Sequence, residues 1–113
     1  MKITNSNYFV KRVKKDIKIN DEEFNYLEIS IRYVRTEKSY CVYFMPLNIK
    51  GGSTIILPSK IRTHRLLTID RRSKNALKKA IEIFNNDIDE YIIYISPVYK
   101  TDFTKEDLYI DID

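Results

Sequence analysis

The sequence is poor in the residues that form cross-links, metal sites and flexible linkers. Its 113 residues include one cysteine, two glycines, three prolines and no tryptophan. A single cysteine, Cys41, excludes an internal disulfide and a zinc site built from several thiolates, and we interpret it as a buried thiol. Because no stretch rich in Gly, Pro or Ser divides the chain, we expect one domain over residues 1–113.

Long apolar runs are absent as well. A membrane-spanning helix needs about 20 consecutive apolar residues, and the sequence has no such run. The polar start, Met1 to Asn7, lacks the hydrophobic centre of a signal peptide. The sequence therefore predicts a cytoplasmic protein that has no membrane partner.

Signatures of catalysis are scarce. The only histidine, His64, lies between Arg62 and Arg65, which favours a surface or phosphate-facing role over general-base catalysis. Asp16-Ile17-Lys18 is similar to the Asp-x-Lys element of metal-dependent nucleases, but no motif supplies a second acidic ligand. Gly51-Gly52 precedes neither Lys-Ser/Thr nor a helix, which indicates a turn and not a phosphate loop. We expect no enzymatic activity and no cofactor.

The strongest periodic pattern runs from Asp70 to Ser96. It predicts one helix of roughly 24 residues, about 36 Å long, with Asp70 or Ser73 as its N-cap. The helix should end at Ser96, because a residue before proline avoids the α region. A break at Asn85-Asn86-Asp87, with residues 91–95 as a strand, is the alternative. The apolar positions at helical spacing are Leu77, Ala80, Ile81, Phe84, Ile88, Tyr91, Ile92 and Ile95.

The first two thirds of the chain favour β-strands. Alternation of apolar and polar residues places Leu27, Ile29 and Ile31 on one face of the second strand, and we expect the helix to pack on them. Further along, one face of the third strand should carry Cys41, Tyr43, Met45 and Leu47. Near the end of the sequence, Thr104 should cap a short last helix. The predicted fold is α+β, an antiparallel sheet of four to five strands with one long helix in the C-terminal half packed across one face. The predicted strands cover residues 8–19, 24–35, 38–48, 54–57 and 65–69.

Charge is distributed unevenly along the chain. Residues 60–79 carry eight basic side chains and one acidic side chain, whereas residues 80–113 carry nine acidic and two basic ones. A helix N-terminus already bears about half a positive charge, so an anion should lie opposite the cations that precede the predicted helix. That anion is a phosphate, an acidic protein surface, or the chain's own Asp107, Asp111 or Asp113. The candidate partner- or anion-binding residues are Lys60, Arg62, Arg65, Arg71, Arg72 and Lys74.

Aromatic residues alternate with basic ones between residues 26 and 44. This pattern is typical of a sheet that binds single-stranded nucleic acid, with bases stacked on rings and phosphates held by cations. It makes Tyr26 and Tyr40 candidate stacking residues. Tyr and Phe are also ordinary strand formers, and the pattern is compatible with structure alone.

Composition adds one resemblance. The favoured residues Ile, Lys, Asn and Tyr have A/T-rich codons, and together with small size and missing catalytic motifs this composition resembles orphan proteins of bacteriophages and mobile elements, including anti-CRISPR inhibitors. The resemblance carries no motif, so it transfers no residue role. It implies a non-enzymatic inhibitor or adaptor that binds a host protein or ribonucleoprotein complex through charged surface. The alternative is a direct DNA- or RNA-binding module that uses the basic helix entrance and the Tyr/Arg sheet face.

Overall fold

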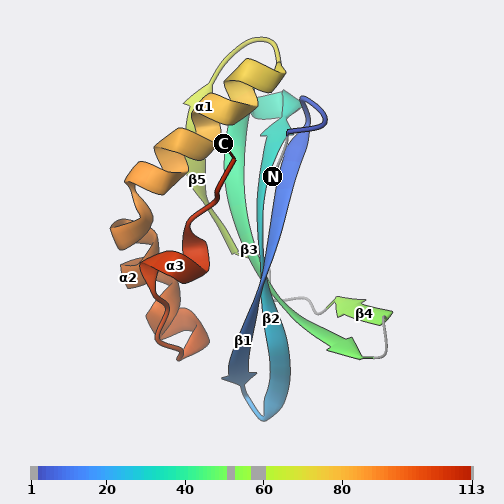
Figure 1. The fold of residues 1–113 in the computed structure, drawn as a ribbon, viewed down its shortest axis with the longest axis vertical. Coiled ribbons are helices and arrows are strands. Elements are labelled where there is room, and N and C mark those ends of the chain that lie inside the picture. The colour runs from blue at the N-terminus through green and yellow to red at the C-terminus, as the bar shows by residue number, and fades with distance from the viewer. Residues whose placement is uncertain (1–2, 51–52, 57–60, 113) are drawn as a thin grey trace.

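The computed structural model describes residues 3–50, 53–56 and 61–112, with the backbone alone at residues 50, 53–56 and 61–64. It shows an antiparallel sheet with helices on one side (Figure 1), so the predicted α+β fold is confirmed. The elements in chain order are β1 (Tyr8–Ile19), β2 (Glu22–Val34), a 3₁₀ turn (Arg35–Glu37), β3 (Ser39–Lys50), β4 (Ser53–Ile56), β5 (Ile61–Thr68), α1 (Lys74–Asn86), α2 (Ile88–Tyr99) and α3 (Lys105–Leu108).

Strand β3 organises the sheet. Strands β1, β2 and β3 form an antiparallel meander, and β3 then pairs with two further strands along its other edge. Its first half pairs with β5, from Ser39 opposite Thr68 to Phe44 opposite Ile61. Its second half pairs with β4, which projects away from the helices (Figure 1). Because β5 is antiparallel to β3, the end of β5 lies beside the start of β3.

The core lies between the sheet and the helices. One buried cluster joins the helices to β2, as the sequence predicts. It contains Leu77, Ile81, Phe84 and Ile88 from the helices and Leu27, Ile29 and Ile31 from β2. Phe44 of β3 joins this core from the sheet, with ring centroids 6.2 Å from Phe84 and 5.9 Å from Tyr91. Burial of these large side chains is the main force that holds the helices on the sheet.

The prediction of one continuous helix is wrong, because α1 and α2 are separate helices with Asp87 between them. The N–H of Asp87 donates to the carbonyl of Phe84, 3.1 Å away, and so closes α1 with a tightened last turn. The carbonyl of Asp87 then accepts the N–H of Tyr91 and starts α2. Residues 91–95 are helical, so the strand alternative is wrong too.

The predicted end of the helix also needs correction. Helix α2 continues through Pro97 to Tyr99 and ends where Lys100 adopts the left-handed conformation. A proline can adopt a helical φ, but it lacks the N–H that would donate to the carbonyl four residues earlier, and its ring crowds that carbonyl. Burial of Tyr91, Ile95 and Tyr99 accompanies this defect and stabilises the helix around it.

Strand β3 alternates as expected, with Cys41 and Tyr43 on the same face of the sheet. Tyr40, Val42 and Phe44 face the helices, whereas Cys41 pairs with Arg32 on the other face. Residues 40–45 are apolar or aromatic throughout, so alternation does not identify the buried face. Cys41 is a buried thiol, as predicted.

The C-terminal segment closes over the helices and β1. Thr104 caps α3 in a reciprocal capping box with Asp107, as predicted for the cap. Asp107 also forms an ion pair with Lys15 of β1 at 2.8 Å. Further on, the side-chain amide of Asn85 donates to and accepts from the backbone of Ile110, at 2.9 and 3.0 Å. These contacts fix the tail along the last turn of α1.

Candidate functional site

A basic pocket lies at the end of the sheet where β5 leads into α1. Its volume is about 460 Å³, and its lining comes from two loops that are far apart in sequence. The turn between β2 and β3 contributes cations, and the loop between β5 and α1 contributes more. The lining residues are Tyr33, Arg35, Lys38, Asp70, Arg71 and Arg72. We call this site the basic pocket.

Strand pairing brings these two loops together. β3 begins beside the end of β5, and the N–H of Ile69 donates to the carbonyl of Lys38 at 2.8 Å. Lys38 has a left-handed backbone, with φ 48°, which closes the 3₁₀ turn after Glu37. The turn therefore sets Arg35 and Lys38 against the loop that carries Arg71 and Arg72.

Two tyrosine hydroxyls hold the loop before α1 in place. The hydroxyl of Tyr33 lies 2.8 Å from the carbonyl oxygen of Ile69 and 2.9 Å from that of Asp70, so its single proton is shared between them. The hydroxyl of Tyr40 donates to the carbonyl of Ser6 at 2.7 Å and accepts the N–H of Ser73 at 3.1 Å. Burial raises the pKa of Tyr40, which keeps this hydroxyl protonated.

The loop ends in a helix cap. The Ser73 hydroxyl accepts the N–H of Ala76 at 3.0 Å, which makes Ser73 the N-cap that the sequence offered as one of two choices. Arg71 and Arg72 immediately precede this cap, where the positive end of the helix dipole disfavours further cations. The fixed backbone of this loop thus sets the positions of Arg71 and Arg72. An anion in the basic pocket would relieve the electrostatic repulsion that these two side chains experience there.

The acidic side chains that the structure describes leave this pocket largely unneutralised. Asp70 lies 3.8 Å from Lys38, but both side chains are strongly exposed, so the pair is weak. Among the described residues, Arg35, Arg71 and Arg72 form no ion pair. Exposed Lys74, the first residue of α1, forms none there either.

The acidic tail, the internal alternative from the sequence, is held elsewhere. Asp107 pairs with Lys15 of β1. Ile110 is bound to Asn85 in the last turn of α1, so Asp111 begins at the far end of that helix from Arg71. The expectation for Asp113 lies outside the described residues. Neutralisation of the basic pocket by Asp107 is excluded by this geometry.

The structure separates the predicted anion-binding residues. Arg71 and Arg72 line the pocket and Lys74 lies next to it, whereas exposed Arg65 pairs with Glu37 at 3.3 Å. Arg62 belongs to β5, opposite Tyr43, and its side chain lies outside the described residues. Lys60 lies outside them as well.

The two candidate stacking residues occupy opposite faces of the sheet. Tyr26 is half-buried and lies on the face away from the helices, opposite Leu47. Tyr40 is fully buried, and its hydroxyl is bonded on both sides, so no face of its ring is open to a base. The stacking role expected for Tyr40 is therefore corrected to a structural role in the basic pocket.

Sequence reasoning missed Lys38 and the pocket roles of Tyr33 and Arg35. Arg35 was grouped with the aromatic sheet pattern, and Lys38 was assigned to the start of the third strand. Both belong to a basic hairpin turn, and pairing of β3 with β5 would have placed that turn beside residues 70–72. This pairing is long-range, so no local sequence pattern reveals it.

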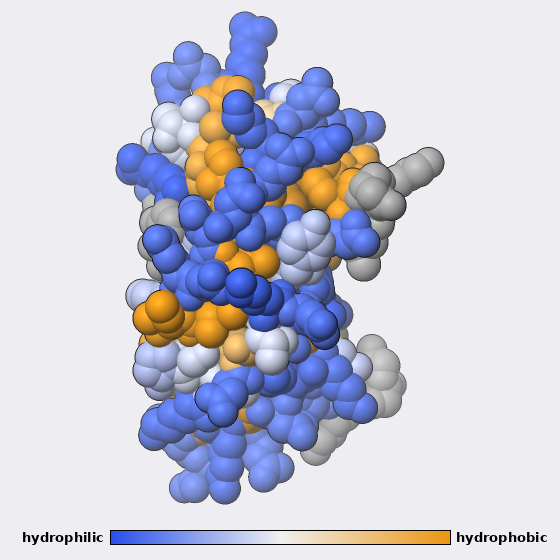
Figure 2. Space-filling model, turned by 60° about the vertical axis from the view of Figure 1, so that its left-hand side comes forward, coloured by the Kyte–Doolittle hydropathy of each residue, from blue (hydrophilic) through white to orange (hydrophobic). Residues whose placement is uncertain are grey.

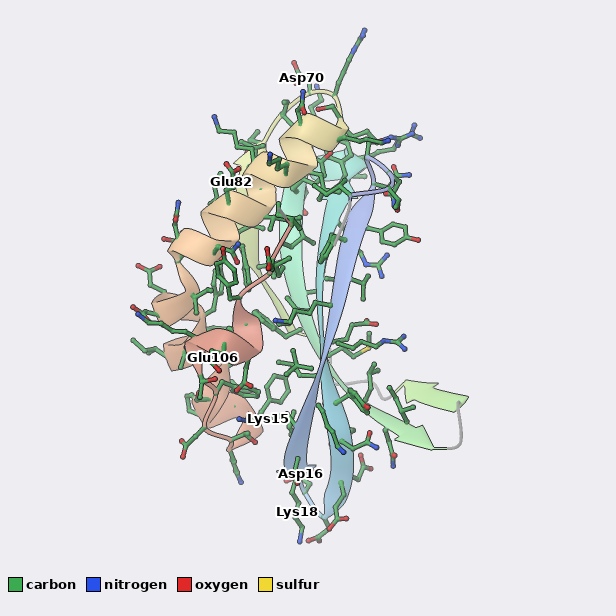
Figure 3. The ribbon with its side chains drawn as sticks, viewed as in Figure 1. Lys15, Asp16, Lys18, Asp70, Glu82 and Glu106 are labelled. Carbon is green, nitrogen blue, oxygen red and sulfur yellow. The ribbon has the colours of Figure 1, made fainter. Side chains whose placement is uncertain are left out.

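The opposite end of the molecule is different in character. Asp16 and Lys18 lie there, far from Asp70 (Figure 3). Asp16 shares a shallow depression with Asp21, Glu23 and Asn25. Within the part of the chain that the structure describes, no group of three or more His, Cys, Asp and Glu side chains is arranged to hold a metal ion. The Asp16-Ile17-Lys18 element thus gains no second metal ligand from the described residues.

The fold and the pocket define an α+β protein with a five-stranded antiparallel sheet, helices on one face and a basic loop pocket at one end. No family model matches the chain, and comparisons with curated proteins and with solved structures give no match. No helix formed by the described residues is both long and apolar enough to span a bilayer.

Proposed function

We propose that this protein is a non-catalytic inhibitor or adaptor of a phage or mobile element that docks through the basic pocket on the phosphate backbone of a host ribonucleoprotein. The observation that carries the proposal is the convergence of Arg35, Lys38, Arg71 and Arg72 on one pocket, whose described lining has Asp70 as its acidic member. The compositional bias toward residues with A/T-rich codons supports the phage origin.

Phosphate suits this pocket better than a protein carboxylate for two reasons. Three of the four cations are arginines, whose planar guanidinium groups bind phosphate oxygens in pairs. The loop that carries Arg71 and Arg72 is held by the hydroxyls of Tyr33 and Tyr40, so its backbone loses little conformational entropy when a ligand binds. A phosphodiester chain also presents several negative charges at regular spacing, which lets it use the neighbouring Lys74.

A second candidate is a module that binds free DNA or RNA without a protein partner. The same pocket favours it, but burial of Tyr40 removes half of the proposed stacking pair. Contacts to phosphate position a nucleic acid without reading its sequence. This candidate therefore predicts binding that depends on charge and backbone and tolerates any base sequence.

The experiment that tests the proposal is fluorescence anisotropy with a labelled single-stranded RNA, a DNA duplex and, as a polyanion without phosphate, polyglutamate. We expect RNA binding that weakens steeply with salt, with a log–log slope of about −0.7 for each phosphate contacted on a single strand. The double variant Arg71→Glu/Arg72→Glu should lose most of this affinity.

The matched control is Lys14→Glu/Lys18→Glu, which makes the same charge change on exposed side chains of β1. It should bind nearly as well as the native chain, because its charges lie away from the pocket. Equal loss in both variants would assign binding to net charge and refute the pocket. Capture of a host complex from lysate, with and without ribonuclease, then separates the two candidates, since a ribonucleoprotein partner retains protein components and free nucleic acid does not.

A further inference from the structure

Helix α2 presents an apolar surface outward as well as inward. Ile93 is 75% exposed, Tyr94 49% and Val98 47%, although Tyr91, Ile95 and Tyr99 of the same helix are buried against the core. Hydrophobic side chains gather on this side of the molecule at the height where α2 lies (Figure 2). We call Ile93, Tyr94, Pro97 and Val98 the outer stripe. Exposed apolar side chains gathered on one face of a helix are a candidate interaction site.

The outer stripe is flanked by opposite charges at its two ends. Glu90 lies one turn before Ile93, and Lys100 caps the helix just after Val98. Both side chains are exposed, and neither forms an ion pair among the described residues. The neighbouring Asp89 differs, since it is paired with Lys105 at 3.4 Å. The outer stripe therefore has a negative charge at its N-terminal end and a positive charge at its C-terminal end.

We propose that the outer stripe is a homodimer interface, in which α2 pairs antiparallel with α2 of a second copy about a two-fold axis. Glu90 and Lys100 are equally far along the chain from Ile95, so an axis near Ile95 brings Glu90 of each copy to Lys100 of the other. The same axis places Ile93 opposite Pro97. A parallel pair would instead set Glu90 against Glu90 and Lys100 against Lys100, which is unfavourable.

A second copy of this chain fits this surface because the charge pattern is self-complementary. Two-fold interfaces require that one patch match itself, and an acid and a base placed symmetrically about the centre meet that condition. One short helix pair covers less than the about 800 Å² per partner of a standard stable interface, so the dimer should dissociate readily on dilution. The inference does not depend on the basic pocket, which lies at the start of α1.

The test is sedimentation velocity of the native chain from about 10 μM to about 1 mM, a range that covers weak association. We expect the weight-average mass to rise toward the dimer with concentration. Ile93→Asp should keep the chain monomeric throughout this range, and its far-UV circular dichroism should remain native because the side chain is exposed.

Charge exchange distinguishes a second copy from any other occupant. Glu90→Lys and Lys100→Glu, made singly, should each weaken dimerisation several-fold, because each places like charges opposite one another. The double variant Glu90→Lys/Lys100→Glu should restore dimerisation to near the native level. Glu82→Lys, the same change on the exposed face of α1, should leave it within about two-fold of native at the same ionic strength.

Three results would overturn the proposal. The first is a native chain that stays monomeric up to about 1 mM, the weak limit of this assay. The second is an Ile93→Asp variant that dimerises like the native chain. The third is a double charge exchange that dimerises no better than the single changes.

Discussion

Helices α1 and α2 follow one another with only Asp87 between them, yet α2 exposes large apolar side chains that α1 does not. The outward face of α1 carries Lys78, Lys79 and Glu82, whereas that of α2 carries Ile93, Tyr94 and Val98. Both helices bury apolar residues against the same sheet. The difference shows that inward packing explains the whole apolar content of α1 but only half of that of α2.

The two helices also begin and end differently. α1 starts at a Ser73 side chain that accepts a backbone N–H, whereas Asp87 before α2 makes no such side-chain bond. α2 also contains Pro97, which cannot donate to the carbonyl of Ile93. Local interactions thus favour α1, and α2 depends more heavily on tertiary packing. The stability predictions below probe this contrast, from the largest expected effect to the smallest.

The largest effect is expected at the inward face. Phe84→Ala removes a fully buried ring that stacks on Tyr91, with ring centroids 4.9 Å apart, and should lower the free energy of unfolding by about 3 to 5 kcal/mol. Urea denaturation followed by circular dichroism measures this loss. In a domain of this size, the variant could be largely unfolded.

The matched change on the outward face is Ile93→Ala in α2, measured at a concentration where the chain is monomeric. It should change the free energy of unfolding by less than about 0.5 kcal/mol, because the side chain is exposed and alanine is the better helix former. Similar losses in Phe84→Ala and Ile93→Ala would contradict the division of α2 into buried and outward faces.

The second effect is a gain in stability. Pro97→Ala restores the missing donor to the carbonyl of Ile93 and removes a residue that costs about 3 kcal/mol in a helix interior. The greater entropy of the unfolded chain without proline offsets about 1 kcal/mol. We therefore expect a net gain of about 2 kcal/mol in urea unfolding.

Val98→Ala is the control for Pro97→Ala, since it also shortens an exposed side chain in the outer stripe without changing backbone hydrogen bonding. It should leave the unfolding midpoint nearly unchanged. A Pro97→Ala variant less stable than the native chain would show that the proline stabilises the end of α2 instead of weakening it.

The sequence predicted the parts of the fold that local patterns determine. The first strand, Tyr8 to Ile19, has the predicted bounds, and Leu77, Ile81, Phe84 and Ile88 pack as expected. Apolar residues stay in helical phase through Asn85 and Asn86, so periodicity alone could not reveal the change of direction at Asp87. The contacts of α2 beyond that point are long-range ones, with β1 and with Phe44 of β3.

The candidate site was only half visible in the sequence for a related reason. Arg71 and Arg72 stand out because they precede a strong helical pattern. Arg35 and Lys38 reach them through pairing between β3 and β5, which closes a long loop in the chain. Tyr40 was misread because its strand is apolar on both faces. Local chemistry therefore identifies single residues, and long-range pairing assembles them into a pocket.

The third effect concerns the start of α1. Ser73→Ala removes the side-chain acceptor of the Ala76 N–H and should destabilise the chain by about 1 kcal/mol, as N-cap losses do. Ser73→Asp retains an acceptor and should keep stability near native. Thermal unfolding at neutral pH measures both.

The same two variants test whether the Ser73 hydroxyl only caps α1 or also belongs to the basic pocket. Tyr40 bonds the backbone of Ser73 and not its hydroxyl, so Ser73→Ala should retain polyanion binding at a temperature where it is folded. Loss of binding together with a native unfolding temperature would show that the Ser73 hydroxyl belongs to the pocket and is not simply a cap.

The smallest effect is expected where the tail secures α2. α3 packs on α2, and Asp107 of α3 binds Lys15 of β1. Burial alone would raise the pKa of Asp107, but hydrogen bonds from Lys15 and the Thr104 N–H, together with the charge of Lys15, leave that pKa below its ordinary value. Since the folded pKa is depressed, the pair stabilises the fold above about pH 4 and loses this effect as pH falls through the folded pKa.

Asp107→Asn should therefore lower stability at pH 7 by less than about 1 kcal/mol, and its stability should converge with that of the native chain near about pH 2. Asp102→Asn, which changes an exposed acid in the same segment, is the control and should match the native chain in stability at pH 7. If the gap between Asp107→Asn and the native chain stayed constant from neutral to acidic pH, the carboxylate would not be the group that ties α3 to the sheet.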